Sequence, residues 1–305
     1  MNRLLDYPSS VIRQLSKVEI LEAIANSEGR IMMAETIGTT QPMLGNISNA
    51  EFVASLGVEL INLNVFDVLD PVVNGLPEKK DLIKQITDLT GCIVGINLEP
   101  VNEEIENDQT DNIWAISKGR LASVENATTA LQMGVRFITL TGNPGVKVDN
   151  ATINASLQKI SAIYHDDLIL IAGKMHASGI KNEANMGIIT KDDIDSFVKN
   201  GADIILLPAV GTVPGITLEY VHDLIDHIHS LNRLALTAIG TSQEGSDVAT
   251  IKQIALMCKM AGADIHHIGD AGYLGMALPE NIFAYSVAIR GIRHTYRRMA
   301  MSIKR

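Results

Sequence analysis

The sequence predicts an α/β protein, a (β/α)8 TIM barrel with an extra N-terminal helix. Near-continuous apolar runs recur along the chain, as expected for parallel strands that are buried on both faces. A segment with helical spacing follows each run, so that strand and helix alternate eight times. The 305 residues suffice for one such barrel of about 250 residues. The expected strands are 31–35, 58–65, 92–98, 137–141, 168–172, 203–207, 234–239 and 264–268.

Residues 1–29 precede the first expected strand and form an N-terminal helical extension. We expect a helix over residues 10–27, because Ser16 and Glu19 have the spacing of a capping box and apolar residues then repeat at helical spacing. A helix in this position is expected to plug the N-terminal end of the barrel. Residues 1–305 are expected to form a single barrel domain.

Further signals mark where helices begin and end. Small polar residues stand at expected N-caps, and a glycine precedes each even-numbered strand, where a left-handed residue would end the helix. This recurrence at a two-strand interval favours a barrel of repeated units over an open doubly wound sheet. The N-terminal signals are Ser48 with Glu51, Thr190 with Asp193, Thr217 and Ser246, and the glycines are Gly57, Gly134, Gly201 and Gly262.

The composition argues against several classes of function. Lys and Arg number 25 against 35 Asp and Glu, a net charge of −10, which disfavours general nucleic-acid binding. No apolar run reaches the length of a membrane span, and no signal-peptide pattern is evident. Cys92 and Cys258 are expected to be buried thiols, which fits a reducing compartment. We therefore expect a cytoplasmic protein with no nucleic-acid or membrane partner.

Two segments stand outside the regular pattern. Residues 100–121, after the third strand, form a long acidic loop with Trp114, which is either a solvated loop or a lid. The closing helix, from near Pro279, carries many cations, which its dipole would stabilise near its C-terminus. We interpret this end as solvated or facing another subunit, and we expect a homo-oligomer. The cations are Arg290, Arg293, Arg297, Arg298, Lys304 and Arg305.

Candidate functional residues follow from the fold, because TIM barrels carry catalytic side chains at the carboxyl ends of several strands. Polar residues cluster at these ends, whereas the strand centres stay aliphatic. The candidate catalytic residues are Glu35, Glu99, Lys174, His176 and Asp270. The candidate substrate-binding residues at strand ends are Asn64, Asn97, Thr141 and Asn143.

Lys174 and His176 are two residues apart in an expected extended run, so they should face the same way. A lysine in a dry barrel mouth can form a Schiff base or stabilise an oxyanion. A histidine beside it can move a proton. The alternative is a lysine paired with a structural carboxylate and a histidine at the rim.

Glu35 and Glu99 end the first and third expected strands. They are candidates for general acid–base catalysis or, with His176, for ligands of a divalent metal, although no dense ligand motif is present. The alternative is a structural network that closes the barrel mouth. The sequence identifies no other cofactor. His266 and His267 are adjacent, so only one can face the barrel interior, and the other is expected to be a core histidine.

The loops after the seventh and eighth strands are rich in glycine, and barrels commonly hold a phosphate there. Glycine lets backbone N–H groups approach an anion, and a helix N-terminus at Ser246 would add a favourable dipole. Glu244, Asp247 and Asp270 work against a nearby anion. The expected phosphate-binding residues are Gly240, Thr241, Ser242, Gly245, Ser246, Gly269 and Gly272.

Short motifs mark strands 2 to 6: GVELINLN at 57–64, VGIN at 94–97, GVRFI at 134–138 and KMHA at 174–177. In this order they resemble, distantly, the BtpA family of (β/α)8 proteins, although other barrels share such motifs. The resemblance implies a barrel fold, and it links the chain to a family associated with sugar metabolism and photosystem assembly. The chain departs from the family at strands 7 and 8.

These features favour a lyase or isomerase that acts on a small phosphorylated metabolite, either a sugar phosphate or a keto acid. The reaction would be proton transfer or carbon–carbon cleavage beside a carbonyl. Lys174 would stabilise the oxyanion or form an imine, and His176 or Glu99 would move the proton. The alternative is a non-catalytic barrel that binds a metabolite or a protein partner, because the fold alone does not choose.

Overall fold

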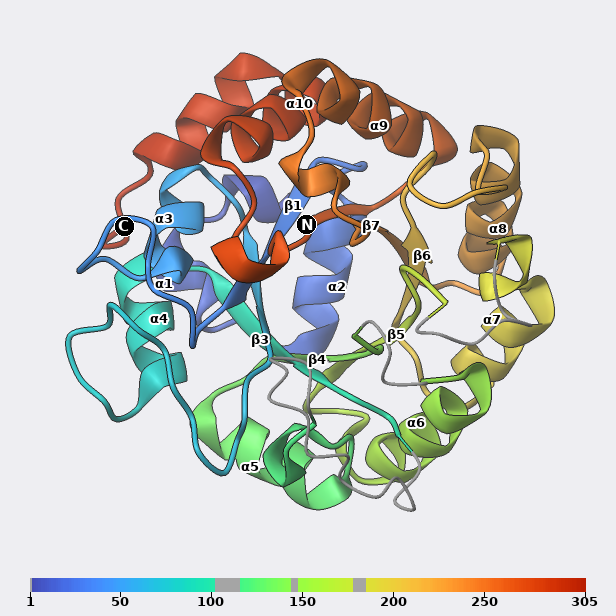
Figure 1. The fold of residues 1–305 in the computed structure, drawn as a ribbon, viewed down its shortest axis with the longest axis horizontal. Helices are drawn as coiled ribbons and strands as arrows, with labels where there is room; N and C mark the ends of the chain where they lie inside the picture. The colour runs from blue at the N-terminus through green and yellow to red at the C-terminus, as the bar shows by residue number, and fades with distance from the viewer. Residues whose placement is uncertain (1, 102–115, 144–147, 178–184) are drawn as a thin grey trace.

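The computed structural model describes residues 2–101, 116–143, 148–177 and 185–305. In these residues eight parallel strands follow one another in sequential order, and β1 pairs with β8 to close the barrel (Figure 1). This confirms the predicted (β/α)8 TIM barrel. The strands are β1 (Ile31–Ile37), β2 (Leu60–Asn64), β3 (Ile93–Leu98), β4 (Phe137–Leu140), β5 (Ile169–Gly173), β6 (Ile204–Pro208), β7 (Leu234–Ile239) and β8 (Ile265–Ile268).

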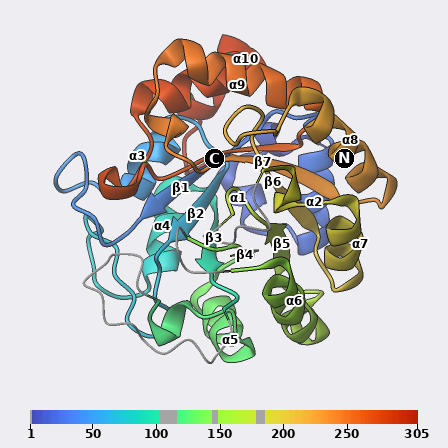
Figure 2. The same ribbon diagram turned by 45° about the vertical axis from the view of Figure 1, so that its right-hand side comes forward.

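Helices form an outer ring around the strands, as Figures 1 and 2 show from two directions. Short 3-10 helices punctuate the connecting loops. The described α-helices are α1 (Ser9–Ile12), α2 (Lys17–Ala25), α3 (Asn49–Ser55), α4 (Leu82–Thr90), α5 (Val124–Met133), α6 (Asn150–Tyr164), α7 (Lys191–Lys199), α8 (Leu218–Ser230), α9 (Val248–Ala261) and α10 (Pro279–Ala300). The 3-10 helices are η1 (Leu4–Asp6), η2 (Lys118–Arg120), η4 (Asn185–Ile188), η5 (Gln243–Gly245) and η6 (Gly272–Leu274).

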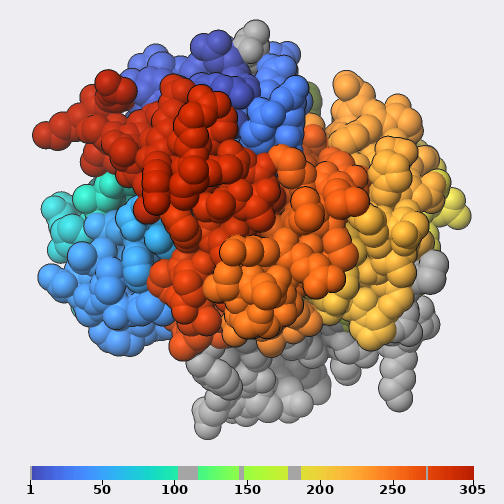
Figure 3. All heavy atoms as spheres, turned by 90° about the horizontal axis from the view of Figure 1, so that it is seen from above, coloured from blue at the N-terminus to red at the C-terminus, as the bar shows by residue number. Residues whose placement is uncertain are grey.

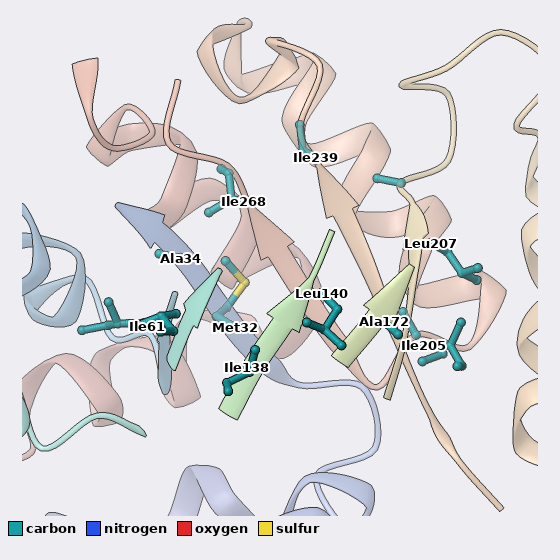
Figure 4. Close-up of a cluster of buried hydrophobic side chains, with 14 of the residues drawn as sticks. Met32, Ala34, Ile61, Ile138, Leu140, Ala172, Ile205, Leu207, Ile239 and Ile268 are labelled. Atoms are coloured by element: carbon teal, nitrogen blue, oxygen red, sulfur yellow. The ribbon is translucent and has the colours of Figure 1, made fainter. Parts of the chain in front are cut away.

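Alternation along the strands divides the apolar core into two parts, because successive side chains point to opposite faces. Outward residues such as Met32 and Ile138 pack between the barrel and the helices (Figure 4). Inward residues such as Met33 and Phe137 belong to a second cluster, which fills the barrel interior. The inward positions nearer the carboxyl ends of the strands are therefore the ones that build a site.

The N-terminal extension closes the barrel interior, but it is not one helix. The helix predicted over residues 10–27 is interrupted at 13–16, between α1 and α2. The reason is the cap itself: the Ser16 side chain accepts from the Glu19 N–H, and an N-cap residue has extended backbone. Ile20 belongs to the same buried cluster as the inward strand residues, and Figure 1 shows α2 behind the centre of the strand ring.

Most of the predicted helix signals are confirmed. Two capping boxes form and Thr217 caps α8, so these helices begin where small polar side chains accept backbone N–H groups. The four repeated glycines have φ between +91° and +105°, the left-handed conformation that ends a helix. The boxes are Ser48 with Glu51 and Thr190 with Asp193, and the glycines are Gly57, Gly134, Gly201 and Gly262.

Ser246 is not the N-cap of α9, contrary to the prediction. Asp247 caps this helix, and its carboxylate accepts hydrogen bonds from the backbone N–H groups of Ala249 and Thr250. A carboxylate is favoured there because it meets both the unpaired N–H groups and the positive end of the helix dipole. The Asp247 carboxylate therefore occupies the N-terminus of α9, where a bound anion would otherwise be stabilised by the helix dipole.

The basic side chains of α10 are not all exposed to solvent. Arg290 and Arg298 are buried against Glu59: Arg290 Nη1 lies 2.6 Å and Arg298 Nε 3.0 Å from Glu59 Oε1. The interpretation as a solvated or subunit-facing end is therefore wrong for these two arginines, whereas Arg293 is exposed. Figure 3 shows the C-terminal residues against the N-terminal ones, and Arg298 Nη1 donates to the Tyr7 carbonyl at 3.2 Å.

Cys92 and Cys258 are buried free thiols, as expected. Burial raises the pKa of Cys92 to about 11, so this thiol stays protonated at neutral pH. None of the helices in the described part of the chain is long and apolar enough to cross a membrane.

Candidate active site

A cavity of about 110 Å³ lies at the carboxyl ends of the strands, where TIM barrels carry their active sites. Since a cavity of about 150 Å³ holds benzene, the described walls enclose room for roughly five non-hydrogen atoms. β6 contributes none of the lining. The lining residues are Glu35, Asn64, Asn97, Thr141, Gly142, Asn143, Met175, His176, Gly240, Ser242, Glu244, Gly269, Asp270 and Gly272.

Just below the cavity, the interior of the barrel has a polar half and an apolar half. β1 to β4 and β8 turn polar side chains inward, among them Asn62, Thr139 and His267. β5 to β7 turn inward Ile171 and Leu206, which belong to the apolar interior cluster. The cavity lies beyond this apolar layer: on the side of β5 and β7 its lining comes from the loops after these strands and includes His176, Ser242 and Glu244, so a ligand there would meet polar groups on both sides.

Glu35 is the centre of the polar half. Its Oε2 accepts from Asn62 Nδ2 at 2.8 Å and lies 3.3 Å from His267 Nε2, while Asn64 Nδ2 lies 3.4 Å from Oε1. The side chain is 5% exposed. Asn64 Nδ2 also reaches Asp270 Oδ2 at 2.8 Å, so the first and last strand ends are joined through β2.

Glu99 anchors the other end of the same network. Arg120 Nη2 lies 2.5 Å from Glu99 Oε1, and the same oxygen accepts from Asn143 Nδ2. Asn143 Oδ1 in turn accepts from Asn64 Nδ2 at 3.0 Å. Glu99 is buried behind Asn143 and is not part of the cavity lining, so its position fits the predicted structural network better than a direct catalytic role.

Glu35 and Asp270 interact as a carboxyl pair. Burial and the nearby Glu35 charge raise the pKa of Asp270 well above its usual range. The pKa of Glu35 is lowered in spite of burial, because hydrogen bonds from His267, Asn62 and Asp270 stabilise its carboxylate. The surroundings therefore favour the ionised form of Glu35 and the protonated form of Asp270.

The histidines divide as their spacing predicted. His266 faces outward and lies 3.1 Å from the Gly29 carbonyl and 3.2 Å from the Tyr285 hydroxyl, a buried core position in which desolvation lowers its pKa to about 3. His267 faces the interior and Glu35. His176 lines the cavity, and burial lowers its pKa to about 4, so the imidazole is neutral at pH 7.

Lys174 does not face the cavity, contrary to the prediction. The run is not extended throughout: β5 ends at Gly173, where φ is +148°, and the chain then bends at Met175 and His176. Lys174 is fully buried outside the barrel, with Nζ 3.4 Å from the Val148 carbonyl. Its pKa falls to about 8, because burial outweighs the nearby charges of Asp149 and Asp193.

The glycine loops have steric reasons for their composition. A Cβ at Gly240 would lie 1.9 Å from Met175 Sδ, and one at Gly269 would lie 2.7 Å from the Ile239 carbonyl oxygen. Thr241 Oγ1 donates to the Thr212 carbonyl at 2.9 Å and does not line the cavity. Gly245 and Ser246 are also absent from the lining, so this part of the expected phosphate loop lies away from the cavity.

Charge in the described lining is acidic. It includes the carboxyl groups of Glu35, Glu244 and Asp270, and its described residues include neither lysine nor arginine. In the described part of the chain no three His, Cys, Asp or Glu residues are grouped so that they could hold a metal ion. The expected lid residue Trp114 lies outside the described residues, while the end of that loop is held to the barrel by the Glu99 N–H, which donates to the Arg120 carbonyl at 2.8 Å.

A family model described as a domain of unknown function, DUF7916, matches residues 5–305. The chain belongs to the DUF7916 family. No curated protein matches the sequence. The resemblance to the BtpA family stays a prediction.

Solved structures of low identity share the fold of this DUF7916 chain. An archaeal fructose 1,6-bisphosphate aldolase matches with a TM-score of 0.55 and 11% identity, over 86% of this chain and 94% of that one. An archaeal aldolase with its catalytic lysine bound to the carbinolamine intermediate has the same score and identity, over 87% and 95%. Thiamine phosphate pyrophosphorylase from Pyrococcus furiosus matches with a TM-score of 0.50 and 11% identity, over 86% and 96%. These matches show the fold alone.

Some site residues of the DUF7916 chain were missed in the sequence. Asn62 carried a usable signal, since it shares its inward parity with the strand-end residue Asn64 of β2, and His267 shares its parity with the inward Ile265 of β8. Glu244 was read only as a charge that opposes an anion, yet its carboxyl lines the cavity. Arg120 had no local signal, because it follows the irregular loop and meets Glu99 only in the folded chain.

Proposed function

We propose that this chain is an enzyme that moves a proton beside the carbonyl group of a small polar metabolite. The observation that carries the proposal is the buried pair Glu35 and Asp270, two carboxyl groups of one cavity whose pKa values are driven in opposite directions. Titratable pairs separated in this way are typical of acid–base sites. The cavity at the carboxyl ends of the strands supports the same reading.

Glu35 is the proposed base. As a carboxylate it takes the proton from the carbon next to the carbonyl, and the electrons of that C–H bond form the enolate. Asp270, the carboxyl group next to Glu35, is protonated and therefore neutral. The site then holds one negative charge in place of two that would repel each other. Return of the proton to the adjacent carbon would give an isomerase. With a β-hydroxy carbonyl substrate, Glu35 would instead take the hydroxyl proton, the O–H electrons would form a new carbonyl group, and the electrons of the broken carbon–carbon bond would form the enolate, which would give a lyase.

A Schiff-base route through Lys174 is not part of the proposal. The ammonium group lies outside the barrel, near Asp149 and Asp193, and would have to cross β5 to reach the cavity. The archaeal aldolase whose catalytic lysine is bound to a carbinolamine intermediate shares the fold at 11% identity, which lends no support to a lysine at this position.

A phosphorylated substrate has support of a different kind. The structural neighbours are named for fructose 1,6-bisphosphate and thiamine phosphate, and this fold commonly holds phosphate after strands 7 and 8. The ionised Glu35 opposes a dianion inside the cavity, and the described lining includes neither lysine nor arginine to offset it. We therefore propose that a phosphate group, where the substrate has one, stays at the mouth of the cavity and the carbonyl end enters.

The test is proton exchange into small carbonyl compounds. Dihydroxyacetone, dihydroxyacetone phosphate and pyruvate are incubated with the enzyme in D2O, and proton NMR follows the loss of the C–H signal next to the carbonyl. We expect exchange with at least one probe, and Glu35→Gln should slow it by about 10² to 10⁴-fold, the usual contribution of a general base.

The matched control is Glu22→Gln, an exposed glutamate of α2 that should leave exchange unchanged. Exchange that survives Glu35→Gln would remove Glu35 from the proposal. Tight binding of a probe without exchange in the wild type would favour the non-catalytic, metabolite-binding barrel instead.

A further inference from the structure

Glu244 lies in η5, the short turn after β7, and its side chain is directed into the protein. The buried Asn281 of α10 holds the turn, because its Nδ2 donates to the carbonyl groups of Glu244 and Ser246 at 2.8 Å each. The Glu244 side chain is buried and lines the cavity. A glutamate in a surface loop would ordinarily turn to solvent, so this orientation calls for an explanation.

Gly269, at the end of β8, lies beside this carboxyl group. A Cβ at position 269 would lie 3.4 Å from both Cδ and Oε1 of Glu244, an ordinary van der Waals contact, and 2.7 Å from the Ile239 carbonyl oxygen. The close approach to that carbonyl is therefore the steric reason for a glycine at this position. The glycine that suggested a phosphate loop lies next to a carboxyl group instead.

One oxygen of this carboxyl has no partner in the described part of the chain. Glu244 Oε2 is buried and accepts no hydrogen bond there. Leaving a buried polar atom unpaired is destabilising. A ligand that bonds to this oxygen would remove that cost, so the orientation of the carboxyl group suits a binding role.

The surroundings favour the neutral form of the carboxyl group. Burial and the Glu35 charge raise the pKa of Glu244, while His267 and the backbone N–H groups of Glu244 and Ala271 work in the other direction. The other titratable groups around the cavity are Asp270, whose protonated form is favoured by burial and by the Glu35 charge, and the neutral His176. A protonated Glu244 would add an O–H donor to a cavity whose lining, on the side of β3 and β4, includes Asn97 Oδ1 and Thr141 Oγ1, both unpartnered among the described residues.

We propose that Glu244 is the acid that complements Glu35, and that it donates its proton to the carbonyl oxygen of the substrate. The inference rests on the proposed function. In the step, Glu35 accepts the proton of the C–H bond, whose electrons form the carbon–carbon double bond. The carbonyl π electrons move to oxygen, which takes the proton of Glu244. The products are an enol, a protonated Glu35 and an ionised Glu244, and the reverse transfers restore both groups.

The first experiment needs no substrate. Infrared difference spectra of the free protein at neutral pH, in H2O and D2O, report protonated carboxyl groups through their C=O stretch. Glu244→Gln should remove one such component, and Asp270→Asn, the control, should remove another. A carboxyl band that is unchanged in Glu244→Gln would overturn the inference. Glu244→Asp keeps a carboxyl group on a shorter stem and should retain a shifted band, and thermal melting of each variant checks the fold.

The second experiment separates this inference from the proposed function. With the probe that exchanges best in D2O, Glu244→Gln should lower the exchange rate by about 10²-fold or more and remove the fall of the rate at alkaline pH. If Glu35→Gln abolishes exchange while Glu244→Gln keeps both the rate and the alkaline limb, Glu244 is not the acid and the proposed function stands. If Glu35→Gln has no effect, the proposed function fails, and the infrared result still decides the state of Glu244.

Discussion

Asp270 should make the stability of the protein depend on pH in a particular direction. Its folded pKa is raised, mainly by burial, so the folded chain binds this proton more tightly than the unfolded chain. The stabilising contribution is full below the ordinary aspartate pKa of 3.8 and is lost as pH rises through the folded pKa. Asp270→Asn should therefore gain stability relative to the wild type as pH rises through that window.

Urea denaturation of both proteins across this pH range measures the effect. The lowered pKa of Glu35 acts in the opposite sense, with stability lost at acid pH, so the two contributions separate by direction. A constant difference between wild type and Asp270→Asn at every pH would mean that Asp270 titrates normally.

The carboxyl groups and amides of the site could be predicted from the sequence because the strand-end rule depends only on where apolar runs stop. Glu35, Asn64 and Asp270 all line the cavity. Lys174 could not be placed, since its direction depends on the left-handed φ of Gly173, which a count of residues along an extended strand does not include. The turn that carries Glu244 is held by Asn281 of the C-terminal helix, a contact without local signal.

At the scale of elements, three glycines near the site should respond to alanine in graded fashion. At Gly173 a Cβ would lie 2.0 Å from the Leu206 carbonyl oxygen, a backbone atom, at a φ of +148°. At Gly240 the obstacle is the flexible Met175 side chain, which can move. At Gly245 nothing lies within 4 Å. Gly173→Ala should cost more than the 1–3 kcal/mol typical of overpacking, Gly240→Ala should fall within that range, and Gly245→Ala should be within about 0.5 kcal/mol of neutral.

Denaturant midpoints of the three variants give this order directly. Equal losses at Gly173 and Gly240 would show that the β5 and β6 backbones separate easily. The boundary between α1 and α2 was also missed in part. Ser16 was correctly predicted as a capping residue, but the helix was still predicted over residues 10–27, because the apolar spacing continues on both sides of the cap.

At the scale of the whole molecule, the barrel was predictable because its strands are buried on both faces and its helices are separated by recurring glycine stops. The hydrophobic periodicity could not predict how the C-terminal helix contacts the N-terminal part of the chain. Arg290 and Arg298 are basic residues of an exposed-looking helix in the sequence, but they lie on Glu59, some 230 residues earlier in the chain. These residues come together only because the pairing of β1 with β8 closes the barrel and brings the C-terminal helix next to β2.

This ion cluster should therefore be a large contributor to the stability of the closed barrel. Glu59 Oε1 meets both arginines, Glu59 Oε2 accepts from the Met32 N–H at 3.0 Å, and Arg290 Nη2 donates to the Gly57 carbonyl at 2.6 Å. Arg290→Met would leave Glu59 with Arg298 as its remaining cation and the Gly57 carbonyl without this donor, so it should lower the free energy of unfolding by about 1–3 kcal/mol. Arg293→Met, on the exposed face of α10, should change it by about 0.5 kcal/mol or less.

The double variant Arg290→Met with Glu59→Gln distinguishes a charge effect from lost packing. Because the second change removes the carboxylate that Arg290 helped to neutralise, the double variant should lose clearly less than the sum of the two single losses in urea denaturation. Additive losses would mean that the cluster stabilises the barrel through its side-chain packing alone. A neutral Arg290→Met would mean that α10 is held to the barrel by its apolar face, with the arginines contributing nothing to the closure between β2 and the C-terminal helix.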